Sequence, residues 1–381
     1  MKAFSLYTPT KIYFGAGTWK KSLQAVAEML QGNVMVVTTG RSLIRLGYLP
    51  ALLEELKQLR EGRECLVYSN IHANPKLAEV EEAVALGKEA QIDTVIGFGG
   101  GSAMDAAKAV AAGIGSPHPV AELLLKGIAP SAETPRIIAM PTTAGTGSEL
   151  SKGAILSSPE HHIKTGIRGE HIYPAVAIVD STFTWQVPRR VTVETGFDVL
   201  AHAIESYVSR KATDFSRLLS ERAIRIVGDC LPALLETPDQ HEARDVMSYA
   251  SMLMGINLGN VGTALPHRMQ YPVGANTDTS HGAGLMALYP AWLRHEYDAA
   301  PEKIQRVIRV LTGTDYSDKV SCCSAMDAFL ERLGERRNLQ ELGLRPEQAA
   351  SLAAQVTGNI QNDRAASEPD VLAKIYSEAM Q

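Results

Sequence analysis

The pattern of residues along the chain changes at about residue 188, and this change limits the folds that the chain can adopt. Before that point, short runs rich in β-branched residues alternate with stretches of helical periodicity. The expected strands cover residues 33–39, 93–97, 136–140 and 175–179, and helical patterns between them include 50–60 and 76–89. Such alternation is typical of βαβ units with a parallel sheet. After that point, strand patterns give way to long stretches rich in Ala, Leu, Glu and Arg. We therefore expect an α/β domain over residues 1–188 and an all-helical domain over residues 189–381.

Size, charge and cysteine content exclude several classes of protein. With 381 residues, the chain is long enough for two domains with sizeable cores. A net charge of −5 gives no basic surface for nucleic acid or for anionic membranes. The four cysteines form no Cys-x-x-Cys pair, which fits a reducing compartment. The N-terminus has no apolar signal core, and no apolar run is long enough to cross a bilayer. The expectation is a cytoplasmic protein that binds neither membranes nor nucleic acid.

Two glycine-containing loops follow expected strands. The first loop, Gly99-Gly-Gly-Ser102, leads into a helical pattern. Successive glycines let backbone N–H groups approach a pyrophosphate, and the start of a helix offers partial positive charge. The alternative is a tight turn without a ligand, because the six-residue G-x-G-x-x-G pattern is absent. The second loop, Pro141-Thr-Thr-Ala-Gly-Thr-Gly-Ser-Glu149, adds hydroxyl groups after another strand. The two loops together favour a dinucleotide site at the carboxyl ends of parallel strands.

The helical half contains a pattern suited to a metal ion. Asp198 and His202 are four residues apart, so on a helix they share one face and can bind one ion. His267 and His281 could complete a shell of one carboxylate and three imidazoles. Such a shell suits a catalytic first-row metal. A lone histidine in an apolar helix is more often a core residue, but a buried unpaired carboxylate four residues away would be costly.

Several segments together resemble the iron-containing (group III) alcohol dehydrogenase family. They are Phe98-Gly-Gly-Gly-Ser-Ala-Met-Asp-Ala-Ala-Lys108, the Pro141–Glu149 loop, Phe197-Asp-Val-Leu-Ala-His-Ala-Ile-Glu205, Ser280-His-Gly282 and the opening Thr8-Pro-Thr-Lys-Ile-Tyr-Phe-Gly15. The resemblance extends from about residue 5 to about residue 300. It implies an α/β N-terminal Rossmann-like domain plus an all-α C-terminal helical domain, the fold that this family shares with dehydroquinate synthase-like proteins.

The resemblance also implies roles for individual residues. It implies that Asp198, His202, His267 and His281 bind Fe²⁺, with Zn²⁺ as the alternative ion. The expected cofactor-binding residues are Gly99, Gly100, Gly101 and Ser102 at the pyrophosphate, Asp105 as the anchor of that loop, and Thr142, Thr143 and Ser151 beside the ribose and nicotinamide. Lys164 matches a lysine that reaches the cofactor ribose and the active site in similar enzymes; without the resemblance, a solvated surface lysine is an equal alternative.

The chain departs from the family pattern after His267. Many members carry a second histidine four residues further on, commonly assigned to proton relay, but here that position is Tyr271. Tyr271 would lie beside His267 on one helix face and could relay a proton through its hydroxyl. A packing tyrosine is an equal alternative. The polar residues Asn257, Asn260 and Arg268 also hint at a polar or anionic substrate.

The choice between NADP and NAD depends on the end of the second expected strand. Members that prefer NAD tend to carry an aspartate there, which binds the ribose hydroxyls and repels a 2′-phosphate. This chain has Thr39, Gly40 and Arg41 instead. These residues leave room and a positive charge for the phosphate, so the sequence favours NADP, with NAD as the alternative.

The function that the resemblance implies is a metal-dependent, NAD(P)-linked alcohol dehydrogenase or aldehyde reductase. Its reaction is reversible hydride transfer between an alcohol and its carbonyl compound, with His267, Tyr271 and Lys164 as the expected catalytic residues. One alternative is an NAD-using lyase or cyclase of the dehydroquinate synthase-like superfamily, although those enzymes typically bind metal through one Glu and two His. Another is a non-catalytic nucleotide-binding homologue. The expected partners are a small alcohol or aldehyde and further copies of the chain, since dimers are common in similar proteins.

Overall fold

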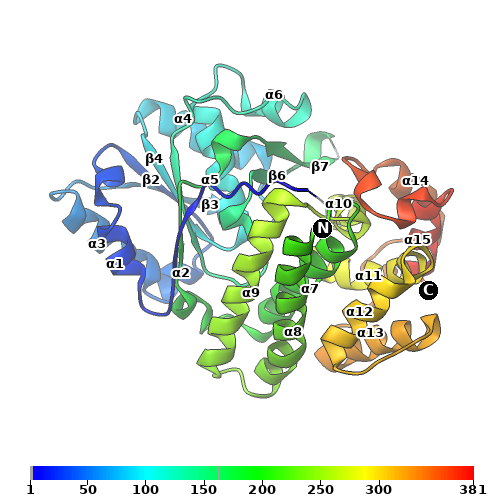
Figure 1. Ribbon diagram of the computed structural model, residues 1–381. Coiled ribbons are helices and arrows are strands. Elements are labelled where there is room, and N and C mark those ends of the chain that lie inside the picture. The colour runs from blue at the N-terminus through cyan, green and yellow to red at the C-terminus, as the bar shows by residue number, and fades with distance from the viewer. Residues whose placement is uncertain (1–2, 162) are drawn as a thin grey trace. The chain divides into compact units, whose positions relative to one another are not determined.

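The computed structural model describes residues 3–161 and 163–381, and the chain divides into two compact units (Figure 1). The α/β unit comprises Thr8–Thr143 and Gly147–Gln186. Among the described residues, the helical unit comprises residues 3–7, Ala144–Thr146 and Val187–Gln381. The change of texture in the sequence thus coincides closely with the main boundary between the units. The short segments at the N-terminus and at 144–146 join the helical unit through tertiary contacts that no local pattern predicts.

The α/β unit is built on a six-stranded parallel sheet in the order β1-β8-β5-β4-β2-β3. The strands are β1 (Lys11–Phe14), β2 (Val34–Thr39), β3 (Leu66–Ile71), β4 (Thr94–Gly99), β5 (Arg136–Pro141) and β8 (Val176–Val179). Strands β6 (Gly153–Ser158) and β7 (Ile163–Arg168) form a separate antiparallel hairpin. The helices are α1 (Trp19–Gln24), α2 (Ser42–Arg45), α3 (Tyr48–Leu59), α4 (Leu77–Glu89), α5 (Gly101–Ile114) and α6 (Val120–Leu125). The predicted Rossmann-like α/β architecture is confirmed.

Apolar side chains cover both faces of this sheet. Val34 and Val36 of β2 pack in one core with residues of α1 and α3. Met35 and Val37 of the same strand pack in a second core with residues of α4, α5 and α6. Successive side chains of a strand point to opposite faces, so a strand covered on both faces is apolar throughout. This explains why β2 and β4 were recognisable as short continuous apolar runs.

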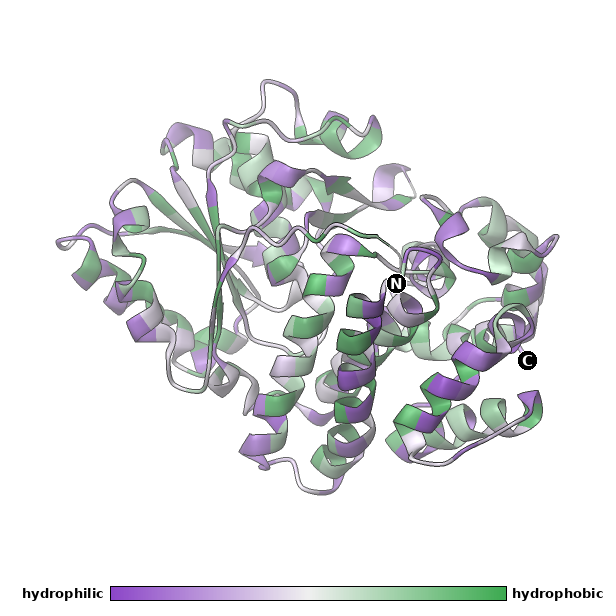
Figure 2. Ribbon diagram, in the orientation of Figure 1, coloured by the Kyte–Doolittle hydropathy of each residue, from purple (hydrophilic) through white to green (hydrophobic). Residues whose placement is uncertain are grey.

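The helical unit carries the rest of the secondary structure. Its helices are α7 (Arg189–Val208), α8 (Asp214–Glu236), α9 (His241–Asn260), α10 (Leu265–Thr277), α11 (His281–Ala299), α12 (Pro301–Thr312), α13 (Lys319–Leu333), α14 (Ala349–Ala354) and α15 (Val371–Ala379). No strand occurs in this unit within the part of the chain that the structure describes, so the predicted all-α character is confirmed. Helix α8 alternates between hydrophobic and hydrophilic residues in Figure 2, as expected of a helix with one buried face.

Among the described residues, no helix combines the length and the apolar character needed to cross a bilayer.

Candidate active site

Three of the four predicted metal ligands converge in the helical unit. Asp198, His267 and His281 each offer a ligand atom, and these atoms lie within 4.8 Å of one another. Oδ1 of Asp198 lies 3.2 Å from Nε2 of His267 and 3.5 Å from Nε2 of His281. Asp198 and His267 are buried, whereas the side chain of His281 is 28% exposed. The cluster therefore opens toward solvent on the His281 side.

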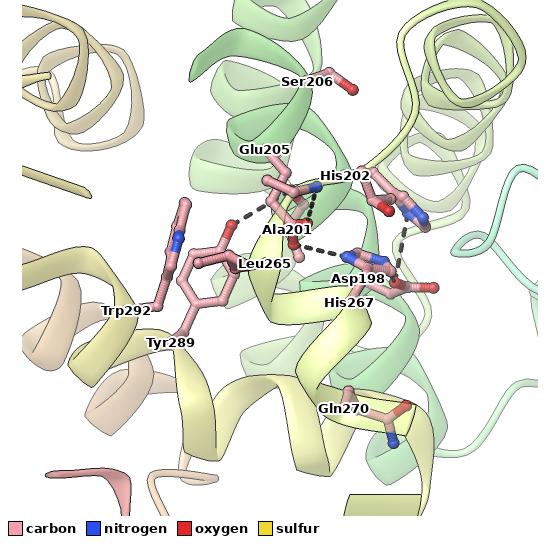
Figure 3. Close-up of polar contacts among 12 residues, drawn as sticks. Asp198, Ala201, His202, Glu205, Ser206, Leu265, His267, Gln270, Tyr289 and Trp292 are labelled. Atoms are coloured by element: carbon pink, nitrogen blue, oxygen red, sulfur yellow. Dashed lines mark hydrogen bonds and ion pairs between the residues drawn. The ribbon is translucent and has the colours of Figure 1, made fainter. Parts of the chain in front are cut away.

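His202 lies beside this cluster. It is four residues after Asp198 on α7, and its Nδ1 lies 3.4 Å from Oδ1 of Asp198. Its ring centroid lies 4.3 Å from that of His267 (Figure 3). The buried Nδ1 of His202 has no hydrogen-bond partner among the described residues. A buried ring nitrogen without a partner is costly unless something else binds it, so this atom fits a role in metal binding.

The charges of the cluster also suit a cation. Burial raises the pKa of Asp198, but the imidazoles of His202 and His281 and the hydrogen bond from His267 outweigh this and hold the pKa well below its usual value. Burial lowers the pKa of His202 to about 3, despite the nearby carboxylate. Asp198 is therefore a carboxylate at neutral pH, and His202 is a neutral imidazole with a lone pair to donate. This is the donor chemistry that Fe²⁺ and Zn²⁺ accept.

The local sequence places each ligand on a helix. Asp198 and His202 share one face of α7, which is buried along most of its length. Pro266 lies in the first turn of α10, where a missing N–H costs nothing, and His267 follows it. His281 is the first residue of α11. Three helices thus supply the four candidate ligands.

Two further residues contact the candidate ligand histidines, and neither was among the predicted site residues. Glu205 on α7 is fully buried, and its Oε1 accepts a hydrogen bond of 2.6 Å from Nδ1 of His267. Gln270 on α10 accepts a hydrogen bond of 2.6 Å from Nδ1 of His281 through its Oε1. In both histidines the opposite nitrogen, Nε2, is the one that faces Asp198.

Two buried carboxylates also hold the start of α10. The N–H of Ala264 donates to Oε2 of Glu205 at 2.7 Å, and the N–H of Leu265 donates to Oδ2 of Asp363 at 2.9 Å. Asp363 also accepts from the indole N–H of Trp292 at 2.9 Å, and it pairs with the carboxyl of Glu296. The first N–H groups of a helix have no partner within the helix, so these contacts satisfy donors that would otherwise be unpaired.

In the α/β unit, the predicted cofactor loops lie along one edge of the sheet. Strands β5, β4 and β2 are neighbours and parallel, so their carboxyl ends meet at the same edge. The residues that follow them are Thr142 and Thr143 after β5, Gly100, Gly101 and Ser102 after β4, and Gly40 and Arg41 after β2, with Gly99 and Thr39 as the final residues of β4 and β2. This is the edge at which parallel α/β sheets bind ligands.

The glycines of the first loop are required by close packing. Gly99 has a φ of +153°, and a Cβ there would lie 2.7 Å from Cβ of Ala103. A Cβ on Gly100 would lie 3.2 Å from the hydroxyl oxygen of Thr143. Helix α5 starts at Gly101, and no side chain caps its first turn. The loop therefore presents bare backbone at a helix N-terminus, which fits a pyrophosphate.

Asp105 and Ser151 take part in a buried network around Lys108. The ammonium group of Lys108 donates to the hydroxyls of Ser148 at 2.7 Å and Ser151 at 3.1 Å, and to the carbonyl of Gly153 at 2.9 Å. Asp105 accepts a hydrogen bond from the backbone N–H of Ile155 at 3.0 Å, and it lies 3.8 Å from Lys108. The network ties α5 to the turn after β5 and to β6. The motif that contains Lys108 predicted no role for this residue.

Lys164 and Tyr271 are both largely buried. Lys164, on β7, donates to the side-chain oxygen of Asn74 at 2.8 Å. Tyr271 lies one turn after His267 on α10, and the guanidinium of Arg268 lies 5.9 Å from the centroid of its ring. The lysine is therefore not the solvated surface residue that was its alternative.

The asparagines that suggested a polar substrate have structural partners instead. Asn257 donates to the carbonyl of Ser216 at 2.9 Å and to the hydroxyl of Ser220 at 3.0 Å, which joins α9 to α8. Asn260 binds the backbone of Tyr7. Their side chains are occupied in holding the fold, so they give no support to a polar substrate.

Comparison with known proteins places the chain in a family. Residues 9–181 match the family described as iron-containing alcohol dehydrogenase, and residues 192–380 match the C-terminal domain of the Fe-containing alcohol dehydrogenase family. The chain belongs to the iron-containing alcohol dehydrogenase family. It is an alcohol dehydrogenase or aldehyde reductase that works with a nicotinamide cofactor.

Individual relatives of this alcohol dehydrogenase agree with it in fold and in reaction class. It is 30% identical to the sulfoacetaldehyde reductase of Bilophila wadsworthia, over 97% of this chain and 98% of that protein. It is 35% identical to the 1-propanol dehydrogenase PduQ of Citrobacter freundii, over 74% of this chain and 70% of that protein. The sulfoacetaldehyde reductase of Bifidobacterium kashiwanohense, solved with NAD⁺, superposes with a TM-score of 0.88 at 27% identity and covers both chains completely. The NADH-dependent butanol dehydrogenase A of Thermotoga maritima superposes with a TM-score of 0.90 at 26% identity, over 100% of this chain and 99% of that one.

Proposed function

We propose that the enzyme reduces small aldehydes with NADPH at a divalent iron held by Asp198, His202, His267 and His281. The observation that carries this proposal is the convergence of Asp198, His267 and His281 within 4.8 Å in the helical unit, with His202 beside them. A divalent ion at this cluster would supply Lewis acidity toward the substrate oxygen, and the nicotinamide would supply or accept the hydride. Zn²⁺ accepts the same donors and is the alternative ion.

The protein's own residues would hold the reactants. The bare backbone of Gly99, Gly100 and Gly101 at the start of α5 would bind the pyrophosphate. Ser102, Thr142 and Thr143 line the same sheet edge and would donate to cofactor oxygens. Asp105 and Ser151, which belong to the Lys108 network, would keep this edge rigid. Lys164 would bind the ribose.

Proton transfer is proposed for Tyr271. Its position one turn after His267 on α10 supports this role, since residues four apart share a helix face. The replacement Tyr271→Phe is expected to lower kcat at neutral pH while leaving metal content unchanged.

The cofactor preference is proposed from the end of β2. Thr39, Gly40 and Arg41 offer no carboxylate there, and Gly40 has a left-handed φ of +55°. The exposed guanidinium of Arg41 would pair with the 2′-phosphate of NADP. Two of the similar proteins are named for NADH or solved with NAD⁺, so NADH is the outcome that would contradict this part of the proposal.

The test is a reduction assay on purified enzyme that has been stripped of metal and reloaded with Fe²⁺ or Zn²⁺. The substrates would be propanal, butanal and sulfoacetaldehyde, which represent the carbonyl compounds that the relatives' names imply. NADPH and NADH would be used in parallel at matched concentrations. We expect stoichiometric loss of nicotinamide absorbance, fastest with Fe²⁺ and NADPH. Turnover without a net change in absorbance would favour a lyase or cyclase instead. Full activity in the His267→Ala variant would refute the metal mechanism.

A further inference from the structure

Glu205 is a buried carboxylate that contacts one candidate metal ligand and the backbone just before it. It lies seven residues after Asp198 and three after His202 on α7, so all three share one face of the helix. Its two oxygens are both used, one by Nδ1 of His267 at 2.6 Å and the other by the N–H of Ala264 at 2.7 Å. Figure 3 shows Glu205 on the far side of the His267 ring from Asp198.

We infer that Glu205 is the positioning residue of the metal centre, which sets the orientation, the tautomer and the donor strength of His267. The inference rests on the proposed assignment of Asp198, His202, His267 and His281 as ligands. A carboxylate can only accept, so Nδ1 of His267 carries the proton. In the neutral imidazole that metal binding requires, the lone pair is then on Nε2, the nitrogen that lies 3.2 Å from Oδ1 of Asp198. A negative acceptor on Nδ1–H also increases the electron density at Nε2.

The second oxygen of Glu205 holds the start of α10, the helix that carries His267. Ala264 is the N-cap of α10, and its N–H is bonded to Glu205 rather than to the helix itself. One side chain thus holds both the ring of His267 and the backbone three residues earlier. The ring and the start of its helix cannot move independently of α7, which carries Asp198 and His202.

The charge of Glu205 links it to a bound cation. Among the described residues, no lysine or arginine forms a salt bridge with this carboxylate, and His267 is the ionisable partner that it has. A divalent ion contributes two positive charges, and Asp198 and Glu205 contribute one negative charge each. The charges of the ion, Asp198 and Glu205 then sum to zero. Because an uncompensated buried charge is costly, Glu205 favours retention of the ion, and the ion stabilises the buried Glu205.

Gln270 provides an internal comparison. It accepts from Nδ1 of His281 with the same 2.6 Å geometry, but its amide is neutral and His281 is partly exposed. Both histidines are therefore oriented by an acceptor at Nδ1, but the acceptor is charged for His267 and neutral for His281. Removal of Glu205 should weaken metal binding more than removal of Gln270 does.

The experiment measures binding of Co²⁺, which replaces Fe²⁺ or Zn²⁺ and reports its coordination through visible d–d absorption. Four full-length proteins would be compared after metal removal: wild type, Glu205→Gln, Glu296→Gln and Asp198→Asn. Glu296→Gln is the matched control, because Glu296 is a buried glutamate of the same unit that contacts no candidate ligand. Dissociation constants come from competition with a chelator, and far-UV circular dichroism checks folding.

We expect the dissociation constant for Co²⁺ to rise about 10- to 100-fold in Glu205→Gln, with an altered d–d spectrum at saturation. Glu296→Gln should match wild type in both measurements. A Glu205→Gln protein with the wild-type constant and spectrum would overturn the inference. If wild type and Asp198→Asn bind Co²⁺ equally, the proposed ligand assignment itself fails, which is a different result.

Glu205→Asp covers the case in which the glutamine variant does not fold. The shorter side chain keeps the charge but cannot reach both Nδ1 of His267 and the N–H of Ala264. We expect a dissociation constant between those of wild type and Asp198→Asn, and a wild-type constant would again overturn the inference.

Discussion

The buried pair of Glu296 and Asp363 predicts an unusual dependence of stability on pH. Both side chains are fully buried in the helical unit. Burial, together with the charge and the hydrogen bond of Asp363, raises the pKa of Glu296 to about 9, although Arg364 nearby lowers it. In the unfolded chain a glutamate titrates near its ordinary value of about 4.3. Between these two values, the folded protein holds a proton that the unfolded chain releases.

The sign and size of the effect follow from proton linkage. Because the native state binds more protons, the free energy of unfolding falls as pH rises between the two pKa values. One proton corresponds to about 1.4 kcal/mol for each pH unit. From pH 6 to pH 8 the wild-type protein should therefore lose about 3 kcal/mol of unfolding free energy from this pair alone. In Glu296→Gln, the amide can donate to Asp363 and accept from the N–H of Ala365 without titrating, so this loss should disappear.

Urea unfolding followed by Trp292 fluorescence measures this difference in the helical unit. Trp292 is buried, and its indole N–H donates to Asp363, so it reports directly on this region. Wild type and Glu296→Gln would both carry Trp19→Phe and Trp185→Phe, which removes the signal of the other unit. As pH rises from 6 to 8, we expect the unfolding free energy of wild type to fall relative to that of Glu296→Gln. If the unfolding free energies of the two proteins depend on pH in the same way, the native state does not hold a proton at Glu296 as argued.

Three further replacements test the α/β unit. Arg41→Asp should raise the KM for NADPH about 10- to 100-fold, since a hydrogen bond to a charged group contributes about 1.5–3 kcal/mol. In the same steady-state assays, the KM for NADH should change little. An equal change for both cofactors would contradict the NADP assignment. Gly99→Ala should destabilise the unit by about 1–3 kcal/mol in urea, because its φ is +153°. Gly153→Ala is its control, because a Cβ there meets nothing within 4 Å, and equal losses in the two variants would argue against strain at Gly99. Lys108→Met should cost about 3–5 kcal/mol by leaving Asp105 without its cation, and an unchanged urea midpoint would exclude this pairing.

Sequence patterns predicted best the strands that are buried on both faces and the helices that have one buried face. The run at 93–97 became β4 at Thr94–Gly99, and the pattern at 76–89 became α4 at Leu77–Glu89. Strand β3 (Leu66–Ile71) was missed because polar Ser69 and Asn70 interrupt its apolar run. The hairpin of β6 and β7 was also missed, although alternate side chains of β6 are buried, because these strands lie outside the parallel sheet and lack its apolar runs.

The residues of the candidate site also divide into those that sequence spacing predicted and those that it missed. Spacing on one helix was enough to connect Asp198 with His202, and the structure brings His267 and His281 close to Asp198. Glu205 was visible in the same motif, but its contacts with His267 and Ala264 span 62 and 59 residues. Helical spacing does not relate positions on different helices, so these contacts require the tertiary fold. The Lys108 network was missed for the same reason, since its partners come from a turn and a hairpin more than 40 residues away.

The two carboxylates at the start of α10 have a consequence for the order in which the protein matures. Glu205 belongs to the middle of the chain, whereas Asp363 lies close to its C-terminus. During synthesis, the ribosome releases the segment around Asp363 only after all four candidate ligands have emerged. The nascent helical unit therefore contains all four candidate ligands before Asp363 can hold the start of α10, the helix that carries His267. Under the proposed ligand assignment, we expect the donors to reach their final arrangement only after Asp363 has joined the unit.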